Sequence, residues 1–324
     1  MIPDVVIHFQ ELSQRLWEKT SLALMQERVF DKMGFGEINW LTSPEGHNTG
    51  GWGMYLTAGK ISALAQLLLQ KGEWNGEQLI PAWWTEEIGK MRVVIPEDEK
   101  KALTHYAYHI KAGKEIFAAE GAFGQYLICF RDYPVAIGIT AGASEYLAAD
   151  ICLKYIKEAV QIPCEKENLE EAQEKLEEKL VHLTLPKPEG DKKDTNEATK
   201  KLLNKRIVFT ENPRQIESAV ISTVGEELKL ELTVAGEKKI LFAGYKDWKC
   251  NDMYPNDFTK RYHAVSYAFD EDALYLSVGL LNTSYREEYC LWVNSEKCSS
   301  WNMETECNVS SGRRRYDMEV YRNI

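Results

Sequence analysis

Apolar residues recur with a helical period over residues 9–33. The positions follow the i, i+3, i+4 spacing of an amphipathic helix: Leu12, Leu16, Leu22, Met25, Val29 and Met33. We expect two helices rather than one, because Thr20 and Ser21, residue types that begin helices, interrupt the pattern. Gly34 and Gly36 are expected to end the second helix, since glycine readily adopts the left-handed conformation of a helix C-terminus.

Two further helices are predicted after a glycine-rich loop. Thr57 is a candidate N-cap, and apolar residues at helical spacing follow it up to Gly72. The next helix begins at Pro81 and is expected to use Trp83, Trp84, Ile88 and Met91 on its apolar face. We interpret the adjacent Trp83 and Trp84 as core side chains rather than as a platform for a substrate.

Strands follow these helices. Runs of apolar and β-branched residues predict them at 106–112, 115–132 and 135–142. The second run is expected to break at Gly121 and Gly124, because glycine within a strand marks a bend or a close approach of the backbone. A helix is predicted over residues 144–160. Helices packed on an antiparallel sheet form an α+β domain, which we place at residues 1–162.

Residues 163–205 have the composition of a connector. The pattern predicts a helix with one apolar stripe and charged residues elsewhere, the stripe being Leu169, Ala172, Leu176 and Leu180. Residues 186–200 are rich in Pro, Gly, Lys and Asp and contain almost no large apolar side chain. We therefore expect a flexible linker there.

Short, partly alternating runs separated by turns predict an all-β domain over residues 206–324. The predicted strands are 206–210, 216–222, 227–235, 239–245, 263–269, 273–281, 288–294, 306–311 and 316–322. Regular short strands of this kind are typical of a small barrel or a sandwich, and the pattern leaves both open.

Composition and charge restrict the possible partners. The chain has 324 residues, of which 44% are hydrophobic and 27% charged, and its formal net charge is −11. This profile is typical of a globular protein of about two domains. The negative charge argues against nucleic acids and anionic membranes as partners. No apolar run reaches the roughly 20 residues of a membrane-spanning helix, and residues 1–20 do not resemble a signal peptide. The cysteine pattern described next is typical of a reducing compartment, so we expect a cytoplasmic location.

The seven cysteines favour free thiols. Their number is odd and none forms a Cys-x-x-Cys pair, although Cys298 and Cys307 could be partners in a hairpin. We expect no zinc site, because no cysteine or histidine pair has ligand spacing, and no other metal or cofactor.

Several segments of the first domain resemble the latter half of the β-lactamase-like serine hydrolase family, which includes class C β-lactamases, penicillin-binding peptidases and related esterases and amide hydrolases. Residues 24–35 are similar to a family helix that ends before a glycine. Residues 49–84 are similar to its glycine loop, the helix after it and the next turn, and residues 118–142 to its two closing strands. Residues 242–248 and 262–278 also resemble the β-rich appendage of some members. The resemblance implies a partial β-lactamase/transpeptidase-like domain followed by an all-β domain.

The resemblance also implies acyl transfer, for which this chain lacks the main groups. In the family a serine of a Ser-x-x-Lys motif attacks the carbonyl, and the lysine and the tyrosine of a Tyr-x-Asn motif move the proton. No Ser-x-x-Lys occurs in residues 1–324. Tyr254-Pro255-Asn256 follows the closing strands, where the order is wrong for the motif, and we interpret it as a turn. No catalytic residue is therefore assigned.

A substrate pocket is expected only in vestigial form at the closing strand. Ala119-Glu120-Gly121 occupies the place of the family's Lys/His-x-Gly motif, and Ala122 would supply an oxyanion N–H. Glu120 and Gln125 are candidate polar contacts, and Phe123 is a candidate wall. Glu120 could equally face water at a strand end, and Phe123 is more simply explained as core.

Lys111-Ala112-Gly113, just before the closing strand, also has the Lys-x-Gly spacing of the family motif. We interpret this segment as a hairpin turn.

Three hypotheses follow. The first is a truncated or degenerate hydrolase relative without independent activity. The second is one half of a split ester or amide hydrolase, completed by a separate N-terminal fragment that supplies the missing motifs. The third is a non-enzymatic binding protein that uses the β domain.

Overall fold

The computed structural model describes most of the chain. The described residues are 10–12, 14–98, 101–142, 148–162, 169–190, 200, 202–212, 215–256, 259–270, 273–281, 283, 286–293, 298–306 and 314–323. The chain divides into two compact units, Met1–Ala141 with Glu145–Pro163, and Gly142–Ser144 with Cys164–Ile324. Each unit is described by itself.

The N-terminal helices of the first unit break where the sequence predicts. Helix α2 (Ser21–Met25) begins after Thr20, whose side chain accepts a hydrogen bond from the backbone N–H of Ala23. The π-helical segment η1 (Gln26–Phe30) continues from it. Gly34 and Gly36 then have φ of 70° and 66°, the left-handed conformation expected at the helix end.

The next elements connect these helices to the main sheet. They are the strand pair β1 (Asn39–Trp40) and β2 (Met54–Tyr55), helix α3 (Ala58–Leu69), the hairpin β3 (Glu73–Trp74) and β4 (Glu77–Gln78), and helix α4 (Ala82–Ile88). The side chain of Thr57 caps α3 as predicted, accepting from the N–H of Lys60 at 3.2 Å. Helix α4 begins after Pro81, also as predicted.

Six strands form one fully antiparallel sheet in the order β10-β9-β8-β7-β6-β5. Their bounds are β5 (Val93–Val94), β6 (His105–Ala107), β7 (Ile110–Ala112), β8 (Ile116–Gly121), β9 (Gln125–Phe130) and β10 (Ala136–Ile139). A short 3-10 helix, η2 (Pro96–Asp98), lies between β5 and β6. The break between β8 and β9 is at the predicted glycines. The expected single strand over residues 106–112 is wrong: Tyr108 and His109 form a turn there, and β6 pairs with β7 as a hairpin.

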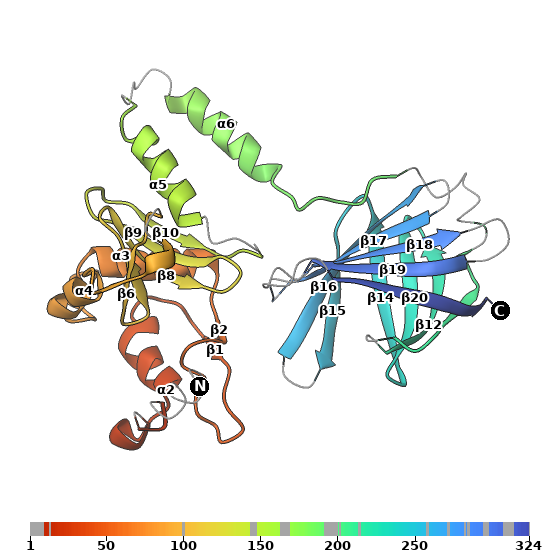
Figure 1. Ribbon diagram of the computed structural model, residues 1–324, viewed down its shortest axis with the longest axis horizontal. Coiled ribbons are helices and arrows are strands. Elements are labelled where there is room, and N and C mark those ends of the chain that lie inside the picture. The colour runs from red at the N-terminus through yellow and green to blue at the C-terminus, as the bar shows by residue number, and fades with distance from the viewer. Residues whose placement is uncertain are drawn as a thin grey trace. The chain divides into compact units, whose positions relative to one another are not determined.

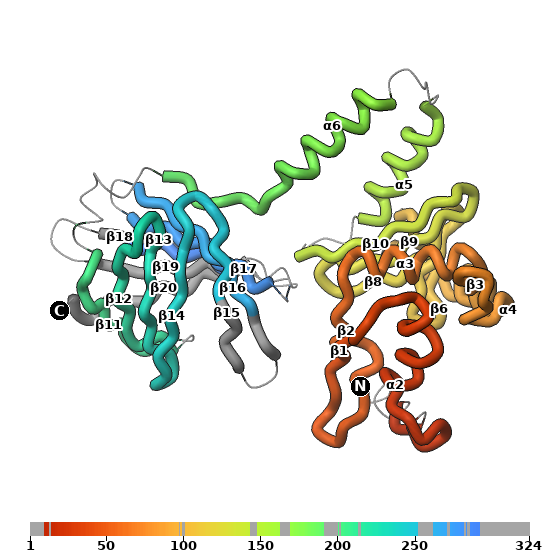
Figure 2. Tube along the Cα trace, turned by 180° about the vertical axis from the view of Figure 1, so that it is seen from behind, coloured from red at the N-terminus to blue at the C-terminus, as the bar shows by residue number. Residues whose placement is uncertain are grey.

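Helices cover both faces of this sheet (Figure 1). On one face α3 packs against side chains that include Phe117 and Cys129, and in Figure 2 it lies across β9 and β10. On the other face α5 (Ala148–Ala159) packs against side chains that include Ile116 and Ile128. Adjacent residues of β8, and likewise of β9, thus belong to different hydrophobic clusters, because successive side chains of a strand point to opposite faces of the sheet.

The connector is partly as predicted. Helix α6 (Leu169–Val181) forms, and all of its residues are exposed. The prediction of a flexible linker over residues 186–200 is wrong for its first residues, because Lys187 and Gly190 contact the β-sheet that follows. The indole N–H of Trp248 lies 3.4 Å from the backbone oxygen of Leu185, and Lys187 forms an ion pair with Asp247. A Cβ at Gly190 would lie 2.2 Å from the backbone oxygen of Phe269, so the backbone packs directly on β16. Most of the remaining linker, residues 191–199, lies outside the described residues.

The second unit is one ten-stranded sheet in the order β14-β13-β12-β11-β20-β19-β18-β17-β16-β15. The strands are β11 (Arg206–Phe209), β12 (Ile216–Val224), β13 (Glu227–Val234), β14 (Glu237–Tyr245), β15 (Lys249–Asn256), β16 (Thr259–Asp270), β17 (Ala273–Leu280), β18 (Arg286–Val293), β19 (Cys298–Glu306) and β20 (Arg314–Asn323). The sheet curls so that β14 also pairs, in parallel, with β16. One curled sheet corresponds to the barrel-like alternative rather than to two stacked sheets.

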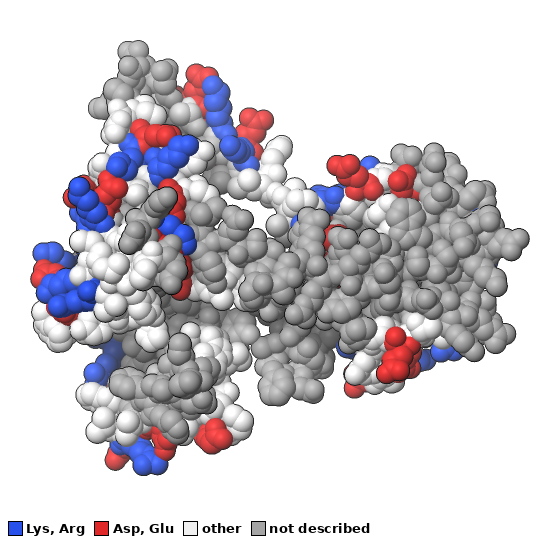
Figure 3. Space-filling model, in the orientation of Figure 1, with Lys and Arg blue, Asp and Glu red and all other residues white. Residues whose placement is uncertain are grey.

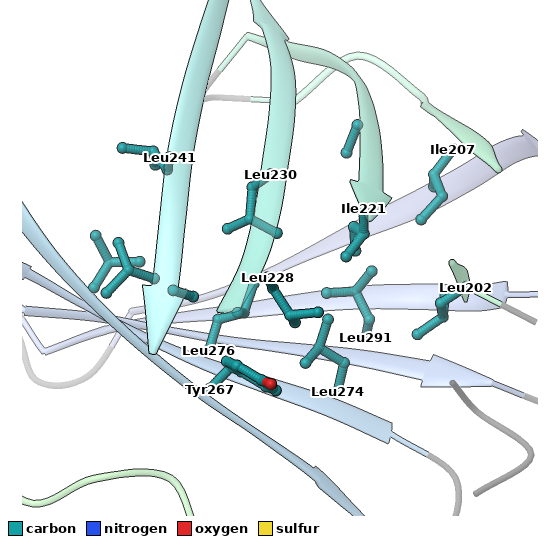
Figure 4. Close-up of a cluster of buried hydrophobic side chains, with 14 of the residues drawn as sticks. Leu202, Ile207, Ile221, Leu228, Leu230, Leu241, Tyr267, Leu274, Leu276 and Leu291 are labelled. Carbon is teal, nitrogen blue, oxygen red and sulfur yellow. The ribbon is translucent and has the colours of Figure 1, made fainter. Parts of the chain in front are cut away.

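The concave side of this sheet holds the larger core of the protein. Figure 4 shows leucine and isoleucine side chains from several strands of this core, with Tyr267 at the edge of the cluster beside Leu228, Leu274 and Leu276. Leu202, which the sequence places in the connector of residues 163–205, is fully buried in this core. The core therefore begins before residue 206.

The second unit differs from the prediction at β15, which is not among the predicted strands, and at β19. Tyr254-Pro255-Asn256 is not a turn, because all three residues belong to β15 and pair with β16. Strand β19 was expected at residues 306–311 but spans Cys298–Glu306, and residues 307–311 lie outside the described residues.

The cysteines were expected to be free thiols. In the described part of the chain Cys129, Cys152, Cys250 and Cys290 are free thiols, as predicted, whereas Cys307 is outside it. Burial raises the pKa of the Cys129 thiol to about 12.

Among the described residues no helix combines the length and the apolar character needed to span a bilayer.

Candidate functional site

The five predicted site residues lie together at the β8–β9 hairpin. Glu120 pairs with Tyr126 and Gly121 with Gln125 in the antiparallel register. Phe123 and Gly124 have φ of 66° and 82°, so the turn uses two residues in the left-handed region. Ala122 is exposed and Phe123 is half-buried at this turn, so the interpretation of Phe123 as core is wrong.

Glu120 does not face water. Its carboxylate lies 2.7 Å from the ammonium nitrogen of Lys111 on the neighbouring strand, and its side chain is only 10% exposed. The register explains the contact. Lys111 pairs with Ala118, so it lies on the same face as Ala118 and Glu120. The prediction of a turn at Lys111-Ala112-Gly113 is correct only for its end: Lys111 and Ala112 belong to β7, and Gly113 begins the connection to β8.

Lys111 is the centre of a larger ion cluster. Its ammonium also lies 3.1 Å from Asp98, which in turn binds Lys101 at 2.6 Å. Asp98 is buried although it stands at the end of the short helix η2. Sequence patterns do not indicate this cluster, because its members come from η2, from the segment after it and from two strands, and their charges alone would suit a solvent-exposed surface.

The cluster determines the charge state of its members. Burial by itself raises the pKa of Asp98, but the hydrogen bonds from Lys101 and Lys111 outweigh it and hold the pKa below its ordinary value. Burial likewise lowers the pKa of Lys111, and the hydrogen bonds to Glu120 and Asp98 outweigh it and raise the pKa. Both groups are therefore stabilised in their charged forms at neutral pH.

Gln125 is also engaged within the protein. Its amide nitrogen donates to the backbone oxygen of Ala141 at 2.5 Å, and its amide oxygen accepts from the N–H of Ala141 at 3.3 Å. The two bonds attach the β8–β9 turn to the segment that follows β10. The Gln125 amide thus forms with Ala141 the same pair of hydrogen bonds that a backbone residue of a neighbouring strand would form.

A nucleophile is not evident at this hairpin among the described residues. Ser62 of α3 lies against the sheet, where its hydroxyl donates to the backbone oxygen of Ala58 at 3.0 Å and accepts from the N–H of Gly138 at 2.9 Å. Both partners are backbone groups, so neither can act as a general base. Ser144 lies outside the described residues.

Tyr-x-Asn sequences occur only in the second unit. In addition to Tyr254-Pro255-Asn256 in β15, Tyr321-Arg322-Asn323 lies in β20. Neither follows the order that the resemblance requires.

A polar hollow lies elsewhere on the first unit. It is lined by Gln66, Gln70, Glu73, Trp74, Asn75 and Gly76, from the C-terminal half of α3 and the β3–β4 hairpin. Ser62 contacts Gly138 and Ala65 contacts Cys129, so α3 runs away from the β8–β9 turn towards this hollow. The hollow is therefore separate from the predicted site.

Metal ligands are not clustered in the described part of the chain, where no group of three or more His, Cys, Asp or Glu side chains is suited to a metal ion. No family model matches the chain, and no curated protein matches it either.

Proposed function

We propose that this chain is a non-hydrolytic relative of the β-lactamase-like serine hydrolases, in which the closing-strand hairpin has a structural role. The sequence resemblance of residues 24–35, 49–84 and 118–142 supports the family. The antiparallel sheet with a helix on each face is compatible with a partial β-lactamase/transpeptidase-like domain.

The observation that carries the proposal is the bonding of the hairpin's polar side chains. Glu120 is bound to Lys111, and both ends of the Gln125 amide are bound to Ala141. A substrate could bind these side chains only by breaking their present contacts. Leaving a polar group without a partner inside a protein costs free energy. The sequence also contains no Ser-x-x-Lys, so the serine and its neighbouring base are missing together.

Active-site probes test this proposal. The purified chain is expected to take no covalent label from a fluorophosphonate or from a fluorescent penicillin, and to hydrolyse simple esters at the rate of buffer. Heat-denatured protein serves as the control for non-specific labelling. A stoichiometric adduct on one serine, located by peptide mass spectrometry and abolished by its replacement with alanine, would contradict the proposal.

A second candidate function is one half of a split hydrolase. It is favoured by apolar side chains near the start of the described chain, where Leu12, Leu16 and Trp17 are 59%, 79% and 50% exposed. Exposed apolar surface of this kind is a feature that binds another polypeptide.

Co-expression distinguishes the two candidates. A polypeptide that supplies Ser-x-x-Lys and Tyr-x-Asn should co-purify with this chain and hydrolyse esters only in its presence. The matched control is the same polypeptide with its Ser-x-x-Lys serine replaced by alanine, which should still bind. If no such polypeptide restores hydrolysis, the split-hydrolase candidate is contradicted.

The third hypothesis, a binding protein that uses the β domain, has less support. The described side chains on the concave side of the sheet pack against one another as a hydrophobic core rather than lining a site.

A further inference from the structure

The polar hollow beside α3 has a lining that the proposed function does not use. Its volume is about 520 Å³, and sites for small molecules measure about 300–1,000 Å³. Helix α3 forms one wall with Gln66 and Gln70, and the β3–β4 hairpin forms the other with residues 73–76. Gln66 and Gln70 are four residues apart on the helix, so both side chains leave it on the same face.

The backbone of the hairpin wall is well held. Asn75 and Gly76 have φ of 50° and 83° and form a two-residue turn, for which Asn-Gly is a preferred sequence. At the base of the hairpin the N–H groups of Leu79 and Ile80 both donate to the backbone oxygen of Gly72. A ligand would therefore meet a wall that is already in place, which lowers the entropic cost of binding.

The polar side chains that line the hollow have no partner within the described part of the chain. No hydrogen bond or ion pair joins the side chains of Gln66, Gln70, Glu73 or Asn75 to another described residue. Three amides and one carboxylate therefore meet in one hollow with their hydrogen-bonding groups free.

Neighbouring polar groups outside the hollow are paired instead. The Gln78 amide donates to the backbone oxygens of Lys71 and Ile80, at 2.8 and 2.5 Å. Glu77 forms an ion pair with Lys32. On the face of the first unit shown in Figure 3, acidic and basic side chains likewise lie next to one another. The unpaired groups of the hollow thus differ from their surroundings and are available to a ligand.

The chemistry of the lining restricts the class of ligand. Among the described residues no Lys, Arg or His lines the hollow, so an anion would meet Glu73 without a compensating cation. An apolar ligand would take the amides out of water without giving them hydrogen bonds. A molecule with many hydroxyl groups suits the lining, because a hydroxyl can donate to a carboxylate and can both donate to an amide and accept from it.

Trp74 adds an apolar surface that a sugar ring can contact. Its side chain packs against the hydrophobic cluster that contains Phe30 and Leu67, and it also lines the hollow. The indole can therefore contact the C–H groups of a sugar while the amides bind the hydroxyls. We propose that the hollow binds a neutral saccharide. This proposal does not depend on the proposed relation to hydrolases.

Fluorine NMR of the full chain, labelled with fluorotryptophan, tests the proposal. The probes are cellobiose, maltose and lactose. At least one of them is expected to shift the signal of Trp74, which is identified by its loss in Trp74→Phe. The shift should saturate with a Kd of about 1 mM, the range expected for a few hydrogen bonds in an open site.

Two glutamates of the same hairpin provide matched variants. Glu73→Ala removes the carboxylate that lines the hollow and should weaken binding by about tenfold or more, as expected for a hydrogen bond to a charged group. Glu77→Ala removes the paired carboxylate outside the hollow and should leave the Kd unchanged. Both residues are exposed, so neither variant should unfold the protein.

Trp83 is the control among the tryptophans. The interpretation of Trp83 and Trp84 as core is wrong, because α4 buries Thr85 and Ile88 instead and leaves Trp83 67% exposed. Trp83 does not line the hollow, so Trp83→Phe should leave the binding of the sugar unchanged.

Two results would overturn the proposal. One is a Trp74 signal that none of the three sugars shifts at concentrations up to about 50 mM, far above the expected Kd. The other is an equal loss of binding in Glu73→Ala and in either control, Glu77→Ala or Trp83→Phe, since the sugar would then bind outside the hollow.

Discussion

At the scale of single residues, Gly138 determines how closely β10 approaches α3. A Cβ at this position would lie 2.3 Å from the backbone nitrogen of Ser62 and 2.6 Å from the backbone oxygen of Ala58. The N–H of Gly138 also donates to the Ser62 hydroxyl. Strand and helix are thus in direct backbone contact, which only a residue without a side chain permits.

Two glycine substitutions should therefore have opposite effects. Gly138→Ala is expected to destabilise the first unit by about 1–3 kcal/mol, because the helix or the strand must move. Gly59→Ala, within α3, should stabilise it by about 0.5–1 kcal/mol, because alanine favours the helix and its Cβ meets nothing closer than 3.9 Å. Urea denaturation followed by circular dichroism measures both. Equal effects of the two substitutions would refute this account of Gly138.

At the scale of elements, the antiparallel register of β7 and β8 assembles the ion cluster. Lys111 reaches Glu120 because both lie on the α5 face of the sheet, and it reaches Asp98 of η2 at the same time. The two carboxylates and the ammonium satisfy each other in a place with little solvent. A partner left alone there would be an uncompensated buried charge, which strongly destabilises a fold.

The cluster predicts a pH dependence of stability. Asp98 has a folded pKa below its ordinary value of 3.8, so its contribution is fully present above pH 3.8 and is lost as the pH falls through the folded value. Asp98→Asn should lower the urea midpoint at neutral pH, and the difference from wild type should shrink in acid. Glu73→Gln on the exposed β3–β4 hairpin is the control. A difference that stays constant with pH would contradict the prediction.

At the scale of the whole molecule, the segment that the sequence marks as a connector contains both exposed and buried leucines. Leu176 on α6 is 50% exposed, whereas Leu202 is fully buried in the core of the second unit. Both leucines stand in charged, polar surroundings in the sequence. Their difference arises only because the chain before β11 packs into the curled sheet, where the N–H of Asn204 bonds the backbone oxygen of Ile221.

The same substitution at these two leucines should give different results. Leu202→Ala is expected to destabilise the second unit by about 2–5 kcal/mol, because it leaves a cavity in a packed core. Leu176→Ala should change stability by no more than about 0.5 kcal/mol. Scanning calorimetry of the full chain measures both. A large effect of Leu176→Ala would show that α6 is covered by a partner.

Local features of the sequence determined the helices, the caps and most strands. Thr57 caps a helix where predicted, the first helical run breaks at Thr20, and Gly121 and Gly124 break the β8–β9 run, because capping and turn formation depend on residues only a few positions apart. The partly alternating runs of β12, β13 and β17, bounded by turns, likewise indicated strands.

Only the tertiary structure decided which side chains meet. Glu120 was expected at a pocket edge or in water, but the strand register places Lys111 beside it. Trp83 and Trp84 were expected in a core, yet in the described part of the chain no layer covers their side of α4. Burial and strand pairing depend on residues that are distant in the sequence. A periodic pattern predicts which residues share a face of a helix or strand, but not which element packs against that face.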